Sequence, residues 1–440
     1  MIIDINSDTL THIKNPKFSA YAKIYVDIYQ KMLAQISQFG LELGATDMAQ
    51  QADQLARLKQ KGAIFRNDSK SIYVNAISPA CVACQTSVGS ATFFISLRCH
   101  RNCFYCFNPN QVDYEYFTAN KRDAVRELEE MAAAGQPLTH VALTGGEPLL
   151  FKEDAVAFFK RASELYPNAH KRLYTCGDLI DKAILEELRS AGLSEIRFSI
   201  RMHDLDKGHR HVFDRIALAR AVIPSVMVEM PVLPGTLEVM QEVLLELDRL
   251  GIDSANLLEF CYPWVNPAPF AERGYQLKRD PYRIPYNYWY AGGLPIVDSE
   301  AECLDLLEFA LDRGLKLGVH YCSLENKHTG QIYQQNFGAS LSPLTYFSNK
   351  DFFLKSAKVY GADIQPVKRA LRRAGYSNFK RNQEHDFLEF GIEAIPALKD
   401  LDVEIGIAYS VMETRDDGQY LRELKVDLTY PKIFDLAADV

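Results

Sequence analysis

The sequence predicts an α/β protein built around a partial or full (β/α) barrel, and two observations lead to this prediction. From residue 91 onward, short apolar runs that read as strands alternate with amphipathic helical patterns, which is typical of parallel βαβ units. The spacing of these runs suits a barrel, in which functional groups gather at the carboxyl ends of the strands. The expected strands are 92–97, 140–144, 172–175, 195–200, 225–230 and 255–260.

Helices are expected between these strands. The first should run from Thr118, as its N-cap, to Gly135, where a left-handed residue would end it. Later helices carry apolar residues at helical spacing and should end at Pro167, Gly192 and Gly251. A capping box at Ser299–Glu302 predicts the start of a further helix, which leads to a seventh strand at 316–321.

Four segments are expected along the chain. In order, they are an N-terminal, mostly helical segment that ends in a Cys-x2-Cys loop (1–90), the barrel (91–261), an aromatic barrel extension with Cys322 (262–345) and a C-terminal α+β extension (346–440). The last segment should contain a hairpin at Asp416–Gly418, because alternating apolar strands flank this turn sequence.

Composition excludes several classes of protein. The 440 residues are 48% hydrophobic and 24% charged, which is globular rather than disordered. The net charge is -8 and no basic block occurs, which argues against non-specific nucleic-acid binding. Neither an apolar run of about 20 residues nor a secretory signal is found, so no membrane association and a cytoplasmic location are expected. An odd number of cysteines, nine, favours metal or redox chemistry over a disulfide framework.

The strongest chemical signal is a Cys-x3-Cys-x2-Cys loop directly after the first expected strand. Cys99, Cys103 and Cys106 can bind one face of an iron–sulfur cube, which leaves the fourth iron open to a small molecule. A structural zinc site is the alternative, but zinc normally takes four protein ligands with paired spacings. Gly145-Gly-Glu-Pro148 follows the second strand, and glycines there allow the backbone to approach a ligand closely.

With these two motifs in this order, the segment from about Ala91 to Cys261 resembles the radical SAM superfamily. The resemblance implies a 4Fe–4S cluster that binds S-adenosylmethionine. It also implies reductive cleavage of that molecule to methionine and a 5′-deoxyadenosyl radical, which abstracts hydrogen. An electron donor of the flavodoxin or ferredoxin type would be a partner. The barrel would then be of the radical SAM type.

The resemblance also assigns contacts to S-adenosylmethionine. Tyr105 matches the position whose backbone contacts adenine, and Ser199 and Arg201 lie where ribose or carboxylate contacts are often found. Glu229 is a further candidate, with a salt-bridged strand acid as the alternative reading. The motif that would hold the methionine amino group comprises Gly145, Gly146 and Glu147.

Two segments depart from familiar patterns. Thr175-Cys176-Gly177 falls where many relatives have Thr-Asn-Gly, so a cysteine replaces the asparagine next to the candidate ligand contact Thr175. Three histidines follow the fourth strand at spacings that match no common metal site, and we expect them to be solvated. They are His203, His209 and His211.

A second group of cysteines lies outside the cluster loop. Cys81 and Cys84 form a Cys-x2-Cys pair, and Cys322 closes the seventh strand. Together they resemble a divergent branch of the pyruvate formate-lyase activating enzyme relatives, which implies an auxiliary iron–sulfur cluster or a zinc ion. Cys261 is the candidate fourth ligand, and buried inert thiols are the alternative. Cys303 shares a helix face with leucines and should lie in the core.

The run from Cys103 to Asn110, with the upstream Cys-x2-Cys, is similar to maturases of ribosomally made peptides. The similarity is to enzymes acting on nif11-type precursors, including spliceases that excise a tyrosine-derived (tyramine) fragment. It implies a lyase that cleaves the backbone of a precursor peptide or protein, with a small accessory protein as a candidate partner. One alternative is a radical SAM enzyme acting on a small molecule, RNA or a glycyl-radical enzyme. The other is an iron–sulfur or zinc redox sensor without turnover.

Overall fold

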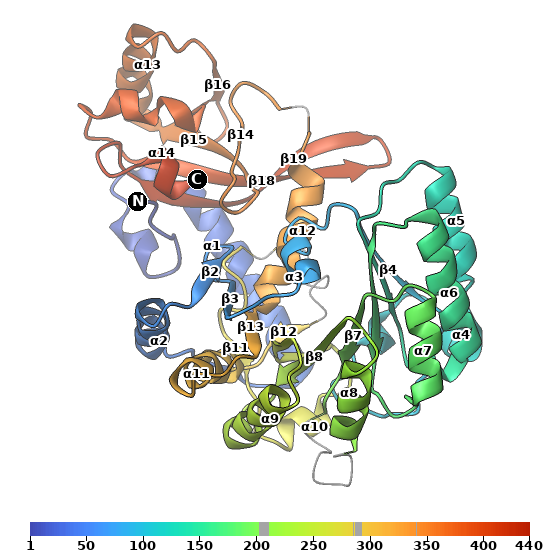
Figure 1. The fold of residues 1–440 in the computed structure, drawn as a ribbon. Helices are drawn as coiled ribbons and strands as arrows, with labels where there is room; N and C mark the ends of the chain where they lie inside the picture. The colour runs from blue at the N-terminus through green and yellow to red at the C-terminus, as the bar shows by residue number, and fades with distance from the viewer. Residues whose placement is uncertain (202–210, 285, 287–292, 340) are drawn as a thin grey trace. The chain divides into compact units, whose positions relative to one another are not determined.

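The computed structural model describes residues 1–440 except 202–210, 285, 287–292 and 340 (Figure 1). The chain forms two compact units. One, the barrel unit, contains Phe39–Pro281 and Tyr288–Gly330. The other, the terminal unit, contains Met1–Gln38, Tyr282–Asn287 and Gln331–Val440. No helix among the described residues is long and apolar enough to cross a membrane.

The barrel unit is built on a sheet with the strand order β2-β3-β13-β9-β8-β7-β6-β5-β4. Its strands are β2 (Ile64–Arg66), β3 (Ser71–Val74), β4 (Ser90–Phe94), β5 (His140–Thr144), β6 (His170–Thr175), β7 (Glu195–Phe198), β8 (Ser225–Val232), β9 (Ser254–Glu259) and β13 (Gly318–Cys322). Strands β4 to β9 and β13 are parallel, which confirms the expected βαβ units, and β3 and β2 add antiparallel edges. Since β2 and β4 end the sheet within the described residues, the barrel is partial.

Helices lie between the strands of this unit. They are α2 (Met48–Gln60), α3 (Pro79–Ala83), α4 (Tyr114–Ala119), α5 (Ala124–Ala133), α6 (Lys152–Leu165), α7 (Lys182–Ser190), α8 (Val212–Arg220), α9 (Leu237–Arg249), α10 (Ala268–Ala271) and α11 (Ser299–Asp312). Helices α5, α6 and α7 lie side by side along the outside of the sheet (Figure 1). Two short pairs complete the unit, β1 (Leu43–Gly44) with β11 (Leu277–Lys278) and β10 (Cys261–Tyr262) with β12 (Leu294–Pro295).

The two faces of the sheet have different chemistry. The outer face carries apolar residues of the core, including Leu173, Ile196, Val228, Leu257 and Val319. Because side chains alternate along a strand, the neighbouring residues point to the other face, which we call the inner face. The inner face carries Arg172, Arg197, Glu229, Asn256 and His320.

One predicted helix start is wrong. The expected helix from Thr118 is two helices, α4 and α5, and Asp123 caps the second by accepting from Arg126 N at 3.0 Å. Thr118 instead lies inside α4, where its hydroxyl donates to Tyr114 O at 2.8 Å. Gly135 follows the end of α5 with a φ of 70°, as expected.

The predicted capping box is also absent, because its residues have partners distant in sequence. The Ser299 hydroxyl donates to Val232 O at 2.8 Å and accepts from Phe260 N at 2.7 Å. Glu302 Oε1 accepts from Gly235 N at 2.5 Å. Ser299 therefore ties α11 to two strands of the sheet rather than closing its own first turn.

The terminal unit is an antiparallel sheet with helices. Its sheet has the order β16-β17-β15-β18-β19, with β14 paired to β15. The strands are β14 (Tyr346–Phe347), β15 (Leu354–Tyr360), β16 (Phe379–Asn382), β17 (Phe387–Phe390), β18 (Ile405–Arg415) and β19 (Gly418–Thr429). The helices are α1 (Pro16–Ile36), α13 (Ile364–Arg373) and α14 (Leu436–Asp439), and α12 (Leu324–Asn336) crosses from the barrel unit. The β18–β19 hairpin confirms the predicted turn.

These units divide the chain differently from the four expected segments. Residues 1–38 belong with the C-terminal sheet because α1 buries an aromatic face on it. The Phe18 ring stacks on Tyr360 with centroids 4.6 Å apart. Within the same expected segment, β2 and β3 join the barrel sheet, which the sequence analysis did not predict.

Candidate functional site

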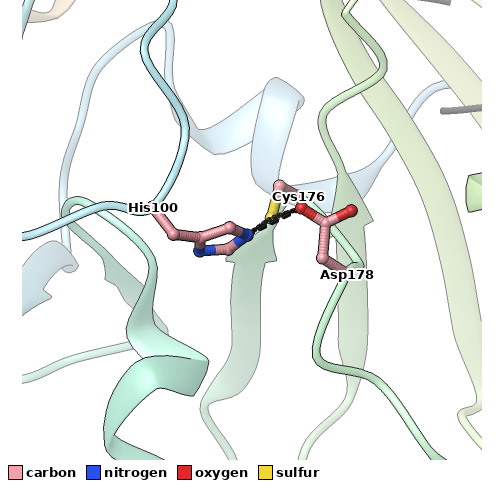
Figure 2. Close-up of side chains that lie close together, drawn as sticks. All are labelled: His100, Cys176 and Asp178. Carbon is pink, nitrogen blue, oxygen red and sulfur yellow. Dashed lines mark hydrogen bonds and ion pairs between the residues drawn. The ribbon is translucent and has the colours of Figure 1, made fainter. Parts of the chain in front are cut away.

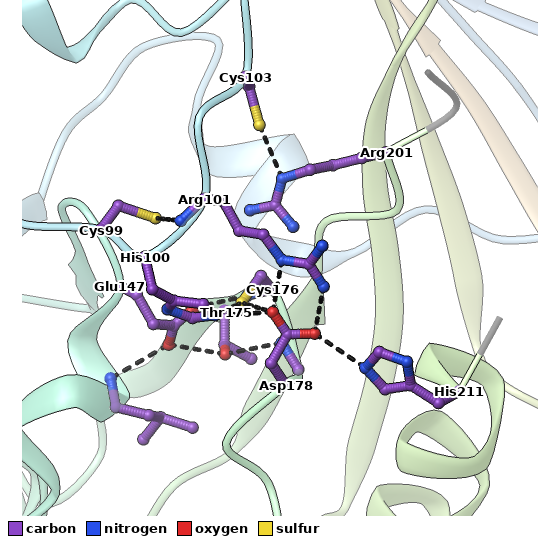
Figure 3. Close-up of polar contacts among 12 residues, drawn as sticks. Cys99, His100, Arg101, Cys103, Glu147, Thr175, Cys176, Asp178, Arg201 and His211 are labelled. Carbon is purple, nitrogen blue, oxygen red and sulfur yellow. Dashed lines mark hydrogen bonds and ion pairs between the residues drawn. The ribbon is translucent and has the colours of Figure 1, made fainter. Parts of the chain in front are cut away.

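The three cysteines of the cluster loop follow the carboxyl end of β4, and Figure 3 shows two of them, Cys99 and Cys103. Arg101 N donates to Cys99 Sγ at 3.4 Å, and Cys106 N donates to Cys103 O at 3.0 Å. Arg201, just beyond β7, donates from Nε to Cys103 Sγ at 2.8 Å. A cation thus faces one thiol from across the sheet.

The thiols of this loop affect one another's pKa through electrostatic interactions. Burial raises the pKa of both Cys99 and Cys106. The Cys103 thiol raises the pKa of Cys99 further, and the Cys99 thiol raises the pKa of Cys106 further. Arg201 lowers both. A cation beside these thiols would offset the negative charge of thiolate ligands to a metal centre.

The spacing of the thiols distinguishes between metal centres. A single zinc ion with bonds of about 2.3 Å in tetrahedral geometry holds its sulfur ligands about 3.8 Å apart. Among the described residues, only His100, Cys176 and Asp178 bring three metal-ligating atoms within 4.8 Å of one another. Cys99, Cys103 and Cys106 do not form such a group.

The glycines after β5 pack against the start of the cluster loop. A Cβ on Gly145, whose φ is 126°, would lie 2.5 Å from Ser96 O. A Cβ on Gly146 would lie 2.0 Å from Arg98 O. Gly146 N donates to Ser96 O at 3.0 Å, and Glu147 N donates to Arg98 O at 2.9 Å. The close approach that these glycines allow is therefore to the protein's own loop.

Glu147 joins the end of β5 to the end of β6. Its side chain is buried, and Oε1 accepts from the Thr175 hydroxyl at 2.8 Å and from Leu149 N at 3.1 Å. Oε2 accepts from Cys176 N at 2.8 Å. The carboxylate thus orders the Thr-Cys-Gly turn, so two predicted contact residues, Glu147 and Thr175, lie together.

Asp178 is the residue at this site that sequence reasoning missed. Its carboxylate accepts from His100 Nε2 at 2.7 Å, from Arg101 Nε at 2.5 Å and from His211 Nε2 at 2.9 Å (Figure 3). Burial raises its pKa, but the hydrogen bonds from Arg101, His100 and Cys176 outweigh this and hold the pKa well below its usual range. The His211 side chain, which we expected to be solvated, is 39% exposed and in addition binds Asp178, while His203 and His209 lie outside the described residues.

His100, Cys176 and Asp178 also form a candidate cation site (Figure 2). Cys176 Sγ lies 3.2 Å from Asp178 Oδ2 and 3.6 Å from His100 Nε2. The Arg101 guanidinium pairs with the same carboxylate, so a metal ion there would face a second positive charge. Burial and Glu147 raise the pKa of Cys176, which keeps its proton available to Asp178. The arrangement is best described as a hydrogen-bond network.

The other predicted contacts lie around the same strand ends. The Tyr105 ring packs on Phe260 with centroids 5.5 Å apart, and Ser199 N donates to Thr175 O at 2.9 Å. Glu229 accepts from Arg197 Nη1 and from Asn256 Nδ2, both at 2.7 Å. Glu229 is thus the salt-bridged strand acid that the sequence analysis named as the alternative.

The second group of cysteines comes together at the inner face. Burial raises the pKa of Cys322 to about 12, and Cys84 and Cys81 add to this increase. Arg197 Nη1 lies 3.7 Å from Cys81 Sγ. Asn326 Nδ2 donates to Cys322 Sγ at 3.3 Å.

The two remaining cysteines differ in surroundings. Burial raises the pKa of Cys261 to about 11, while Lys327, which also acts on Cys84 and Cys322, lowers it. Cys303 is fully buried in the barrel core, as expected.

The parallel sheet and the cysteine loop at its carboxyl edge lie in a segment that matches a known protein family. Residues 93–247 match the family model of the radical SAM superfamily, and this segment is a radical SAM domain. The chain is 27% identical over 207 residues to a protein of Methanocaldococcus jannaschii named as a glycyl-radical enzyme activating enzyme; the match covers 44% of this chain and 52% of that protein. It is 30% identical over 115 residues to a PqqA peptide cyclase of Granulibacter bethesdensis, covering 26% of this chain and 29% of the cyclase.

One solved structure that the chain partly matches is Streptococcus suis SuiB bound to the precursor peptide SuiA. The identity is 15%, the TM-score is 0.39, and the match covers 66% of this chain and 56% of that one. The chain matches about half the length of the Methanocaldococcus relative and less of the cyclase.

Proposed function

We propose that this protein is a radical SAM enzyme that modifies a ribosomally made peptide or protein. The observation that carries the proposal is that the loop with three cysteines follows β4 and that its first residues, Ser96 and Arg98, accept backbone hydrogen bonds from the Gly-Gly-Glu turn after β5, within the segment that matches the family model. A 4Fe–4S cluster bound by Cys99, Cys103 and Cys106 would supply the electron that cleaves S-adenosylmethionine. A donor of the flavodoxin or ferredoxin type would in turn reduce it.

The surrounding residues would position the loop and the ligand. Arg201 donates to Cys103 Sγ and offsets thiolate charge, and Asp178 holds the loop through His100 and Arg101. Glu147 has three protein donors, so it would order the backbone of the strand ends around the methionine group. The other candidate contacts lie at or after the carboxyl ends of β4, β5, β6 and β7; they are Tyr105, Gly145, Gly146, Thr175 and Ser199.

A peptide substrate is supported by the relatives named as PqqA peptide cyclases. We infer backbone cleavage of the splicease type, with excision of a tyramine unit, from the run Cys103 to Asn110 and the Cys-x2-Cys pair. A small accessory protein would present the precursor. The second candidate is activation of a glycyl-radical enzyme, which the Methanocaldococcus relative favours.

We propose an auxiliary iron–sulfur cluster at Cys81, Cys84 and Cys322, with Cys261 as a candidate fourth ligand. The thiols of Cys84 and Cys81 both raise the pKa of Cys322, which supports a shared site for the three cysteines. Arg197, beside Cys81 Sγ, would stabilise the thiolate.

Anaerobic reconstitution with iron and sulfide, followed by assay for 5′-deoxyadenosine, tests the enzyme class. The wild type should form this product from S-adenosylmethionine and reductant, and Cys99→Ala should not. Cys303→Ala, a substitution in the core, is the matched cysteine control. If the wild type has an intact cluster and is given reductant but forms no 5′-deoxyadenosine, the proposal of an enzyme is refuted. The alternative of a redox sensor would then stand.

Substrate and auxiliary site are tested separately. Small peptides encoded beside the gene should be modified, and a glycyl radical detected on a partner enzyme would instead support the second candidate. Cys322→Ala should leave cleavage of S-adenosylmethionine intact and abolish peptide product. Loss of both activities together would assign Cys322 to a structural role.

A further inference from the structure

The inner face of the barrel sheet is unusually polar. Interiors of (β/α) barrels are normally filled by branched apolar side chains. Here the register places polar residues side by side on neighbouring strands. Arg172 is paired with Glu195, Glu229 with Asn256, and Asn256 with His320.

Of the two arginines on this face, Arg197 has its positive charge balanced by acidic side chains. Arg197 donates from Nε to Glu195 at 2.5 Å and from Nη1 to Glu229 at 2.7 Å. Its Nη2 donates to the Ser78 hydroxyl at 3.0 Å. Both acids are thereby committed to Arg197.

Arg172 is not matched in this way. The residue is 7% exposed, and within the described part of the chain its buried Nε and Nη1 have no hydrogen-bond partner. The neighbouring acid, Glu195, already accepts hydrogen bonds from Arg197 and from the Ser78 hydroxyl, the latter at 2.7 Å. Its carboxylate also lies 3.3 Å from His170 Nε2. A guanidinium buried without an acceptor is strongly unfavourable unless a ligand supplies one.

Other unpartnered atoms lie on the same face. Asn256 Oδ1 and His320 Nδ1 are buried and have no hydrogen-bond partner among the described residues. Both guanidinium groups lie near the Tyr174 ring, with Arg172 Cζ 5.9 Å and Arg197 Cζ 5.3 Å from its centroid. A ligand that fills these positions needs an anionic acceptor for Arg172 and an N–H donor for Asn256. A peptide with a carboxylate offers both groups.

We propose that the inner face recognises a carboxylate of the peptide substrate through Arg172, and that Asn256 accepts a peptide N–H. The inference rests on the proposed function, because it takes the bound peptide to be the substrate of the radical chemistry. Arginine binds carboxylates through strong, charge-assisted hydrogen bonds, whereas Arg197 is neutralised and cannot serve.

A competing role for Arg172 is visible in the structure. Its charge lowers the pKa of the Cys84 thiol, so it could serve only the thiolate of a metal centre. That role predicts loss of bound iron when Arg172 is replaced, and no preference for a carboxylate ligand.

The test uses the full chain, reconstituted anaerobically with iron and sulfide, and titration calorimetry. One probe is N-acetyl-glutamate N-methylamide, and the glutamine analogue differs only in lacking the charge. N-acetylglycine distinguishes a main-chain carboxylate from a side-chain one. Arg172→Gln is compared with Arg215→Gln, which removes the same charge from α8, where Arg215 Nε is also buried without a partner among the described residues.

The wild type should bind the glutamate probe, or N-acetylglycine, about tenfold or more tightly than the glutamine probe. Arg172→Gln should remove this preference and Arg215→Gln should keep it. Equal binding of acid and amide by the wild type overturns the proposal without reference to any variant. Equal loss of the carboxylate preference in both variants also overturns the proposal. So does loss of iron from Arg172→Gln when the wild type does not prefer the carboxylate probe to the amide probe.

The same preparation is assayed for 5′-deoxyadenosine. Carboxylate preference without this product would overturn the proposed enzyme and leave the binding site. The product without any carboxylate preference would overturn the binding site alone.

Discussion

Gly146→Ala is the substitution whose effect can be worked most directly from the structure. The added Cβ would lie 2.0 Å from Arg98 O, 2.3 Å from Arg98 C and 2.5 Å from Leu97 O. All three are backbone atoms of the segment that leads into Cys99, so no side chain can rotate away. Reaching an ordinary contact of 3.4 Å from Arg98 O requires a displacement of about 1.4 Å.

That displacement would change the geometry of the proposed reaction site. It separates the cluster loop from the turn after β5, whose Gly146 N and Glu147 N donate across the same contact. Misplacement by about 1 Å can reduce the rate of a reaction about 100-fold. We therefore expect 5′-deoxyadenosine formation by the reconstituted enzyme to fall about 100-fold. The crowding should also cost about 1–3 kcal/mol of stability.

Gly391→Ala is the matched control. Its Cβ would meet only Pro343 O, at 3.6 Å, and like Gly146 it does not have a left-handed φ. This variant should keep wild-type activity and thermal stability. Wild-type rates of 5′-deoxyadenosine formation in Gly146→Ala would refute the reasoning, since the loop would then tolerate the shift.

Two further predictions concern buried carboxylates. Asp178→Asn removes the charge that pairs with Arg101 and should lower the free energy of unfolding by about 2–4 kcal/mol in urea titrations. Asp181→Asn, at the N-cap of α7, should be nearly neutral because asparagine caps equally well, and equal losses would contradict the role of Asp178. Burial raises the pKa of Glu195, but the guanidinium paired with it dominates and lowers the pKa from 4.5 to about 2. The stability that Glu195 contributes, about 3 kcal/mol, is thus present above pH 4.5 and is lost as pH falls towards 2. Glu195→Gln should flatten this part of the pH dependence of the urea midpoint, and an unchanged slope would count against the ion pair.

The strands of the barrel could be predicted because their signal is local. The run 140–144 is β5 residue for residue, since one face of each such strand is continuously apolar against helices. The strands β2 and β3 were missed because each is very short, and they form through pairing with distant chain: β3 pairs with β13, far along the sequence, and β2 pairs with β3. The capping box failed for a related reason, since Ser299 bonds to two strands rather than to its own helix.

The sequence by itself determined the cysteine loop and the glycine turn, because each motif is contiguous and its chemistry follows from residue type and spacing. Only the tertiary structure revealed Asp178, whose partners include Arg101 and His211, because a carboxylate has no sequence periodicity that marks it. The same holds for Arg172 and Arg197. Both read as ordinary strand cations, and only the strand register matches the charge of Arg197 and leaves Arg172 unpaired on the inner face.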